Sequence, residues 1–213
     1  KALNDKIKEH SGLKYWQTEY SILESPGESE IPNGNGNKRD LGMQTALFVA
    51  RTIHNDLTLV NASSWSWWTA LTRADYKDGL VYLDDGTNNG SQVTDYCKKD
   101  GFARDSKLMW MLGNYSFFVR PGMKRVAAVS YTHLTLPTIS AYKDGSSKKI
   151  VLVAVNVGSV NRKYNLQDLK LKNQTLTPYT TSETSNLGKG TTIKTNEIVV
   201  PAKSVVTFVG ELE

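Results

Sequence analysis

The pattern of apolar residues changes at Pro121-Gly122, and this change constrains the fold more than any other feature of the sequence. Before it, stretches with helical spacing alternate with short aromatic or β-branched stretches, an order that predicts consecutive β/α units. After it come only short β-type stretches separated by Gly, Asn, Ser and Lys, which is typical of an antiparallel β-sandwich. We therefore expect an α/β part over residues 1–120 and an all-β part over residues 121–213, with the boundary near residues 119–123.

The first part predicts helix, strand, helix, strand and helix in that order. These elements fall within residues 1–10, 14–22, 40–54, 57–71 and 105–119, with a further short strand over residues 79–84. Asp40 is the expected N-cap of the middle helix. The second part predicts strands over residues 123–128, 150–157, 176–181, 197–200 and 204–209.

The composition limits the classes of protein and of site that the chain can form. Its 213 residues, 39% of them hydrophobic, are ordinary for a globular protein with a sizeable core. The 26 basic and 21 acidic residues give a net charge of +5 but are interspersed, so we expect no nucleic-acid partner. No apolar run reaches the length of about 18 residues that a membrane-spanning helix needs. Cys97 is the only cysteine, and His10, His54 and His133 lack ligand spacing, so neither a disulfide framework nor a metal site is expected.

The aromatic sequence around Glu19 is the strongest candidate for a functional site. Trp16 and Tyr20 flank Glu19 at the end of a predicted strand, just before a Gly/Asn-rich loop. In a β/α barrel, the carboxyl ends of the strands form the active-site face. Sugars present flat apolar faces and hydroxyl rims, so indole rings beside a carboxylate suit a carbohydrate. The alternative is that Glu19 only anchors a loop at the surface.

A second aromatic cluster, Trp65, Trp67 and Trp68, lies at the end of the next predicted strand. Alternation along the strand places Trp65 and Trp67 on one face and Trp68 on the other. Clustered tryptophans also pack in cores, so we expect at least one of the three to be structural. Glu24, Glu28 and Glu30 fall in the loop after Glu19, where solvated charge is the simpler interpretation of three carboxylates.

Five segments of the chain resemble glycoside hydrolase family 30, and they point to its bacterial endo-β-1,6-galactanase-like branch. They are LKYWQTEYSILE, IHNDLTLVNASSWSWWTAL, DGLVYLD, SKLMWMLGNYSFFVRPGMKRV and PAKSVVTFVGEL, in this order over nearly the whole chain. The resemblance implies the last two β/α units of a (β/α)8 barrel followed by an antiparallel β-sandwich. It also implies that Glu19, at the end of barrel strand seven, is the nucleophile. Trp16, Tyr20, Trp65 and Trp67 would then bind the substrate.

The same resemblance implies what this sequence lacks. A whole barrel needs about 250 residues and eight strands, and the family's general acid/base lies on strand four, which this chain does not contain. Asn196-Glu197 copies the Asn-Glu pair of that strand, but it precedes Ile198-Val199-Val200 in the sandwich part, so we interpret it as an ordinary strand start. The chain begins at Lys1 rather than Met, which fits a sequence cut from a longer one.

The function implied is that of a retaining endo-glycoside hydrolase acting on a β-linked polysaccharide such as a galactan, without a cofactor. Its partner would be a polysaccharide or oligosaccharide, the protein a monomer, and the intact form secreted, periplasmic or attached to the cell surface. We expect these 213 residues alone to be inactive. The alternatives are a non-catalytic carbohydrate-binding module and a sandwich that only braces a barrel. Glu19 at a strand end favours the enzyme, because a binding platform does not require it.

Residues 129–138, VSYTHLTLPT, interrupt the resemblance, which resumes near Ser140. The codons GTC TCT TAT ACA CAT CTG ACG CTG CCG ACG encode this stretch and resemble read-through of a transposase-type sequencing-library adaptor. We therefore expect the stretch to be foreign to the natural gene and assign no function to Tyr131 or His133. The alternative is a genuine edge strand, because the residues alternate and Pro137 closes the run.

Overall fold

The computed structural model describes residues 2–10, 12–23, 31, 38–84, 101–126, 138–166, 169–194 and 196–213. The chain forms two compact units, Lys1–Met109 and Trp110–Glu213, which divide within helix α3 (Lys107–Ser116). The domain boundary near residues 119–123 stays a prediction. Among the described residues, no helix is both long enough and apolar enough to cross a membrane.

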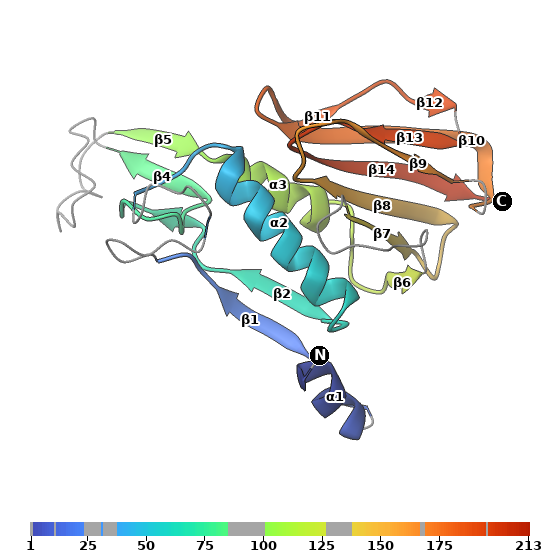
Figure 1. Cartoon of the computed structure of the whole chain (residues 1–213), viewed down its shortest axis with the longest axis horizontal. Coiled ribbons are helices and arrows are strands. Elements are labelled where there is room, and N and C mark those ends of the chain that lie inside the picture. The colour runs from blue at the N-terminus through green and yellow to red at the C-terminus, as the bar shows by residue number, and fades with distance from the viewer. Residues whose placement is uncertain are drawn as a thin grey trace. The chain divides into compact units, whose positions relative to one another are not determined.

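The first unit contains the predicted order of helix, strand, helix and strand. These elements are α1 (Ala2–Glu9), β1 (Trp16–Tyr20), α2 (Met43–Thr58) and β2 (Ser64–Trp67). β1 and β2 are parallel neighbours joined through α2, which makes one β/α/β unit (Figure 1). Ala46, Val49, Ala50 and Ile53 are buried at helical spacing along α2, so one face of this helix forms the core of the unit.

Asp40 caps α2 from a position before the helix. One oxygen of its carboxylate accepts the Gly42 N–H at 2.8 Å, and the other accepts the Thr45 N–H at 2.9 Å and the Thr45 hydroxyl at 2.7 Å. These bonds satisfy a donor that the first turn of the helix leaves without an intrahelical partner. The helix therefore begins at Met43, later than the sequence predicts, and its N-cap is Gly42. The prediction of Asp40 as the N-cap residue is wrong, although its carboxylate still accepts the Thr45 N–H in the first turn.

A small three-stranded sheet follows β2. Its strands, in the order β3-β4-β5, are β3 (Leu71–Thr72), β4 (Val81–Asp84) and β5 (Phe102–Asp105). β3 is parallel to β4 and β5 is antiparallel to it. The sequence predicts only the middle strand. Asp105 pairs with Val81 in this sheet, so α3 begins at Lys107 rather than at Asp105.

The second unit is built from two antiparallel sheets. The larger has the order β11-β10-β14-β8-β7-β6, with β12 also paired to β10, and the smaller joins β9 to β13. Their bounds are β6 (Lys124–Val126), β7 (Thr138–Lys143), β8 (Lys149–Asn156), β9 (Arg162–Asn165), β10 (Leu171–Ser182), β11 (Ser185–Lys189), β12 (Ile193–Lys194), β13 (Glu197–Val200) and β14 (Ser204–Leu212). In the described part of the chain after α3, no helix occurs, as predicted.

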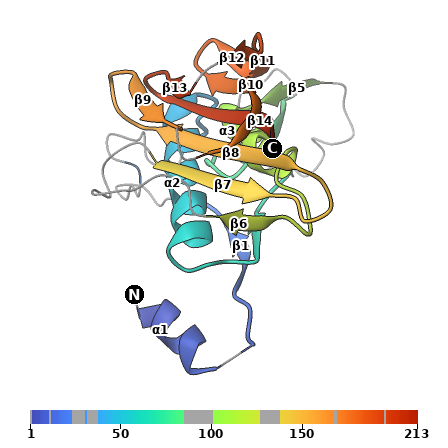
Figure 2. The same ribbon diagram turned by 90° about the vertical axis from the view of Figure 1, so that its right-hand side faces the viewer.

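The core of this unit lies between the two sheets (Figure 2). Leu152 on β8, Phe208 on β14 and Ile198 on β13 are among its fully buried members. The other face of the large sheet is held by α3, because Nδ2 of Asn114 donates to the Tyr179 carbonyl at 2.9 Å and to the Thr207 hydroxyl at 3.0 Å. β8 is therefore buried on both faces, which explains its unbroken apolar sequence.

Most of the stretch that interrupts the family resemblance lies outside the described residues. Residues 127–137 lie outside the described residues, and only Thr138, which begins β7, is placed. The prediction that residues 129–138 are foreign to the natural gene and the alternative of an edge strand therefore both stay untested.

Candidate functional site

The pairing of β1 with β2 contains an irregularity at Glu19. Gln17 pairs with Trp65 and Tyr20 pairs with Trp67, so two residues of β1, Thr18 and Glu19, lie opposite one residue of β2. A bulge of this kind re-aims side chains and is frequent next to active sites. Strict alternation would place Thr18 and Glu19 on opposite faces of β1. The bulge instead turns Glu19 to the same face as Thr18.

The two faces of the strand pair differ in exposure. On one face Trp16, Thr18, Glu19, Ser66 and Trp68 are exposed, with the two indoles 61% and 54% exposed. On the other face Gln17, Tyr20, Trp65 and Trp67 are each half-buried. Glu19 therefore shares an open face at the carboxyl ends of the strands with one tryptophan from β1 and one that follows β2.

The covered face holds an aromatic cluster of Tyr20, Trp65 and Trp67. The two indoles stack with ring centroids 6.3 Å apart and an interplanar angle of 16°. Tyr20 packs on both, at 5.8 Å from Trp65 and 6.0 Å from Trp67. The Trp65 N–H donates to the Asp56 carboxylate of α2 at 2.9 Å, and the Trp67 N–H donates to the Asp78 carbonyl at 2.7 Å. The N–H groups of both indoles thus form hydrogen bonds within the unit, which fixes the orientation of each ring.

Polar contacts also support the strand end that carries Glu19. The Tyr15 hydroxyl donates to the Gln17 side-chain carbonyl, and the Gln17 amide donates to the backbone carbonyl of Glu19 at 2.8 Å. Burial raises the pKa of Tyr15, and the nearby charge of Asp56 raises it further. Burial also raises the pKa of Asp56, against the opposing effect of its bond from Trp65. The Tyr15 hydroxyl therefore stays protonated as a donor through ordinary pH.

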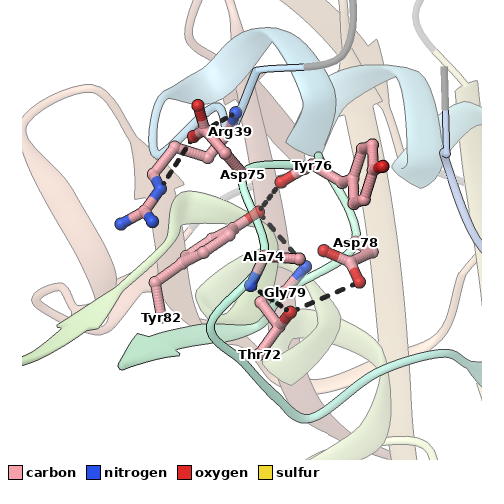
Figure 3. A network of polar contacts seen from close by, with 8 residues as sticks. All are labelled: Arg39, Thr72, Ala74, Asp75, Tyr76, Asp78, Gly79 and Tyr82. Carbon is pink, nitrogen blue, oxygen red and sulfur yellow. Dashed lines mark hydrogen bonds and ion pairs between the residues drawn. The ribbon is translucent and has the colours of Figure 1, made fainter. Parts of the chain in front are cut away.

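The turn between β3 and β4, whose polar contacts Figure 3 shows, also holds Trp67 and the residues after it. The Asp78 carbonyl accepts both the Trp67 N–H and, at 2.8 Å, the backbone N–H of Thr69. The fully buried Tyr82 braces this turn, because its hydroxyl donates to the Tyr76 carbonyl at 2.7 Å and accepts the Gly79 N–H at 3.1 Å. A side chain at Gly79 would not fit, since its Cβ would lie 2.9 Å from Cζ of Tyr82.

Arg39 links this turn to the segment that follows β1. Its backbone N–H and Nε both donate to one carboxylate oxygen of Asp75, at 3.2 and 3.0 Å, and its guanidinium lies 5.0 Å from the centre of the Tyr82 ring. Burial raises the pKa of Asp78, despite the hydroxyl of Thr72 at 3.5 Å from its carboxylate. The segment after β1 and the turn between β3 and β4 are therefore joined by one partly buried polar network.

The structure separates the predicted substrate-binding residues into two groups. Trp16 shares the open face with Glu19, whereas Tyr20, Trp65 and Trp67 lie on the covered face. Trp68, which the sequence analysis did not select, is on the open face, and its backbone N–H extends the strand pairing by donating to the Tyr20 carbonyl at 2.9 Å. The signal for Trp68 was present in the sequence, since strand alternation already separated it from Trp65 and Trp67.

Two further candidates are placed in other elements of the described chain. Glu197 begins β13 in the sandwich, as expected of a strand start, and His54 is buried in α2. Cys97, His133 and the loop carboxylates Glu24, Glu28 and Glu30 lie outside the described residues. Among the described residues, no group of three or more His, Cys, Asp or Glu side chains is placed to hold a metal ion.

Comparison with known proteins relates the chain to one family of enzymes. The family model of O-glycosyl hydrolase family 30 matches residues 1–82, which include β1, α2 and β2. A glucuronoxylanase of Bacillus subtilis is 31% identical over 205 residues, which are 93% of this chain and 40% of the relative. The chain is therefore similar to O-glycosyl hydrolase family 30, whose model covers its first 82 residues. It spans about two fifths of the length of that curated family relative.

Solved structures show a similar fold. A conserved exported protein from Bacteroides fragilis matches with a TM-score of 0.79 and 34% identity over 98% of this chain and 41% of its own. A family 30 endoxylanase from Clostridium papyrosolvens matches with a TM-score of 0.66 and 23% identity over 98% of this chain and 46% of its own, and this likeness shows the fold alone. These neighbours, together with the β/α/β unit and the antiparallel sheets, support a partial β/α barrel joined to a β-sandwich.

Proposed function

We propose that this chain is the C-terminal part of a retaining glycoside hydrolase that cleaves a β-linked polysaccharide, and that Glu19 is its nucleophile. One observation carries the proposal: the bulge in β1 exposes the Glu19 carboxylate on the same face as Trp16 and Trp68, at the carboxyl ends of two parallel strands. This is the edge of a β/α barrel at which catalytic groups gather. Similarity to O-glycosyl hydrolase family 30 supports the same chemistry.

In the complete enzyme, the Glu19 carboxylate attacks the anomeric carbon while a second carboxylic acid protonates the departing glycosidic oxygen. A covalent glycosyl-enzyme forms, and water releases the sugar with the second group now acting as the base. A retaining enzyme places its two carboxyl groups about 5–5.5 Å apart. By family resemblance the second carboxyl belongs to a strand that this chain does not contain, so we propose that the 213 residues alone are inactive.

The two aromatic groups take different roles in this proposal. Trp16 and Trp68 offer exposed indole faces for stacking on sugar rings. Tyr20, Trp65 and Trp67 support the strand ends, because their rings pack together and both indole N–H groups are bonded within the unit. We propose this supporting role for Trp65, Trp67 and Tyr20 in place of direct contact with the sugar.

The sugar and the location are also proposals. The curated relative is named a glucuronoxylanase, so glucuronoxylan is tested beside the galactan that the sequence resemblance suggested. A structural neighbour is described as an exported protein, and we propose that the intact form of this protein is likewise exported and acts as a monomer.

The experiment compares Glu19→Gln with Glu197→Gln in the complete enzyme. Both changes remove one carboxylate at a strand position, but only the first removes the proposed nucleophile. We expect turnover of the preferred polysaccharide to fall by about a thousandfold or more in Glu19→Gln, with the melting temperature kept, and to stay near normal in Glu197→Gln. Near-normal turnover in a folded Glu19→Gln variant would overturn the proposal.

A further inference from the structure

A pocket of about 440 Å³ lies on the large sheet of the second unit, and none of its lining residues belongs to the Glu19 face. It lies where the ends of β8, β10 and β14 meet the segment before β12. Seven of its nine described lining residues are polar, among them Lys148, Lys149, Thr175, Thr177 and Thr192.

The register of the strands explains why the surface is hollow here. Thr177 of β10 pairs with Val209 of β14, and Lys149 of β8 pairs with Glu211 of β14. By alternation, Val209, Glu211, Thr177 and Lys149 share one face of the sheet, whereas Gly210 faces the core, where a Cβ would lie 2.8 Å from Cδ2 of the core residue Leu176. The floor of the pocket is therefore the short Val209 side chain, with longer polar side chains around it.

The pocket carries positive charge that no described residue neutralises. Its one carboxylate, Glu211, already accepts Nζ of Lys172, outside the lining, at 2.9 Å. Within the described residues, neither the Lys148 nor the Lys149 ammonium forms an ion pair or hydrogen bond. Two ammonium groups are thus left to face an incoming ligand, one of them on the half-buried side chain of Lys149.

Hydroxyl groups surround these charges. The Thr177 and Thr192 hydroxyls are 2.8 Å apart and share one hydrogen bond, and the Thr175 hydroxyl donates to the Lys172 carbonyl at 3.3 Å. A hydroxyl offers one donor and two acceptor positions, so each of the three retains bonding capacity toward the pocket. Sugar hydroxyls are suited to such a rim.

The charge of the whole chain is concentrated in the same unit. Residues 110–213 contain 13 basic and 6 acidic residues, a net charge of +7, whereas residues 1–109 contain 13 basic and 15 acidic residues, a net charge of −2. A one-sided excess of this kind attracts polyanions over a distance and raises their local concentration.

We propose that this lysine–threonine pocket binds an acidic polysaccharide through a uronate residue, whose carboxylate pairs with Lys148 and Lys149 and whose hydroxyls bond to the threonine rim. The pocket chemistry favours a glycan over a nucleic acid, because no aromatic ring for base stacking and no arginine is among the described residues that line it. The proposal does not depend on the catalytic role of Glu19, since the two sites share no residue.

The test measures binding of polygalacturonate to the chain at about 0.15 M salt, with neutral β-1,4-galactan and double-stranded DNA as comparison ligands. The variants are Lys148→Gln/Lys149→Gln, Thr177→Val and, as the matched control, Lys189→Gln/Lys203→Gln. The control removes the same charge from exposed positions of the same unit outside the pocket.

We expect the parent chain to bind polygalacturonate more tightly than either comparison ligand. The Lys148→Gln/Lys149→Gln variant should weaken this binding about tenfold or more, Thr177→Val should weaken it less, and the control should bind like the parent. Three results would overturn the proposal: no binding by the parent, equal losses in the pocket and control variants, or binding of DNA as tight as that of polygalacturonate.

Discussion

Removing the hydroxyl of Tyr82 tests whether the turn after β3 is held by the network that the structure shows. The Tyr82 side chain is fully buried, and its hydroxyl both donates to the Tyr76 carbonyl at 2.7 Å and accepts the Gly79 N–H at 3.1 Å. Tyr82→Phe deletes both hydrogen bonds without changing the shape of the ring. The Gly79 N–H and the Tyr76 carbonyl are then left without this partner.

The expected loss of stability follows from these two bonds. Each hydrogen bond contributes about 1 kcal/mol net to the free energy of unfolding, and a buried donor left without a partner costs about 1–3 kcal/mol. Tyr82→Phe should therefore lower the free energy of unfolding of the first unit by about 2–4 kcal/mol. Because the same turn places the Asp78 carbonyl against Trp67, the environment of Trp67 should change in the folded state as well.

Urea unfolding followed by tryptophan fluorescence measures this effect, since four of the five tryptophans, Trp16, Trp65, Trp67 and Trp68, lie in the first unit. The matched control is Tyr76→Phe, because the Tyr76 hydroxyl makes no hydrogen bond to any described residue (Figure 3). The control should lie within about 0.5 kcal/mol of the parent chain. Equal stability of Tyr82→Phe and Tyr76→Phe would refute the reasoning.

Three further predictions concern pH, the sandwich and the open face. Folding raises the pKa of Asp56 above its ordinary value of 3.8, so the stability of the first unit should fall as pH rises from that value through the folded pKa. Asp56→Asn keeps an acceptor for the Trp65 N–H and should remove this fall, as measured by urea unfolding at a series of pH values. Asn156→Ala should lower the unfolding free energy of the sandwich by about 3 kcal/mol in calorimetry, because the Val200 and Pro201 carbonyls and the Gly158 N–H lose their hydrogen bonds to the Asn156 side chain. Unchanged stability would contradict this prediction. In the complete enzyme, Trp68→Ala should raise the KM about tenfold, whereas Trp65→Phe should lower stability and leave KM nearly unchanged; the reverse result would place the sugar on the covered face.

The sequence predicted elements where a single local signal decides them. The Asp40 carboxylate, the apolar spacing of α2 and the continuous apolar run of β8 each act within a few residues, and the structure contains all three features. The start of α3 was placed too early because Asp105 pairs in β5, a contact with Val81 that no local pattern encodes. β3, with two residues, and β9, with the polar sequence RKYN, are strands only because a partner strand pairs with them.

The candidate site also depends on contacts that no local sequence pattern encodes. Glu19 and its aromatic neighbours are visible in the sequence, but the bulge that turns Glu19 to the open face exists only in the register of β1 against β2. The sequence separates Trp68 from Trp65 and Trp67 by alternation without saying which side is open. That choice depends on Asp56 of α2 and on the turn at Asp78, which occupy the N–H groups of the other two indoles.

Trapping the covalent intermediate tests the role of Glu19 most directly. A 2-deoxy-2-fluoro glycoside with a good leaving group lets the glycosyl-enzyme accumulate, because the fluorine slows its hydrolysis. Cleavage after Lys14 and Lys38 gives a peptide that contains Glu19 together with Glu24, Glu28 and Glu30, so fragmentation in the mass spectrometer must locate the sugar. In the complete enzyme we expect the label on Glu19 and none in the Glu19→Gln variant. A label on another carboxylate, or inverted product with no labelled protein, would contradict the assignment of Glu19 as nucleophile.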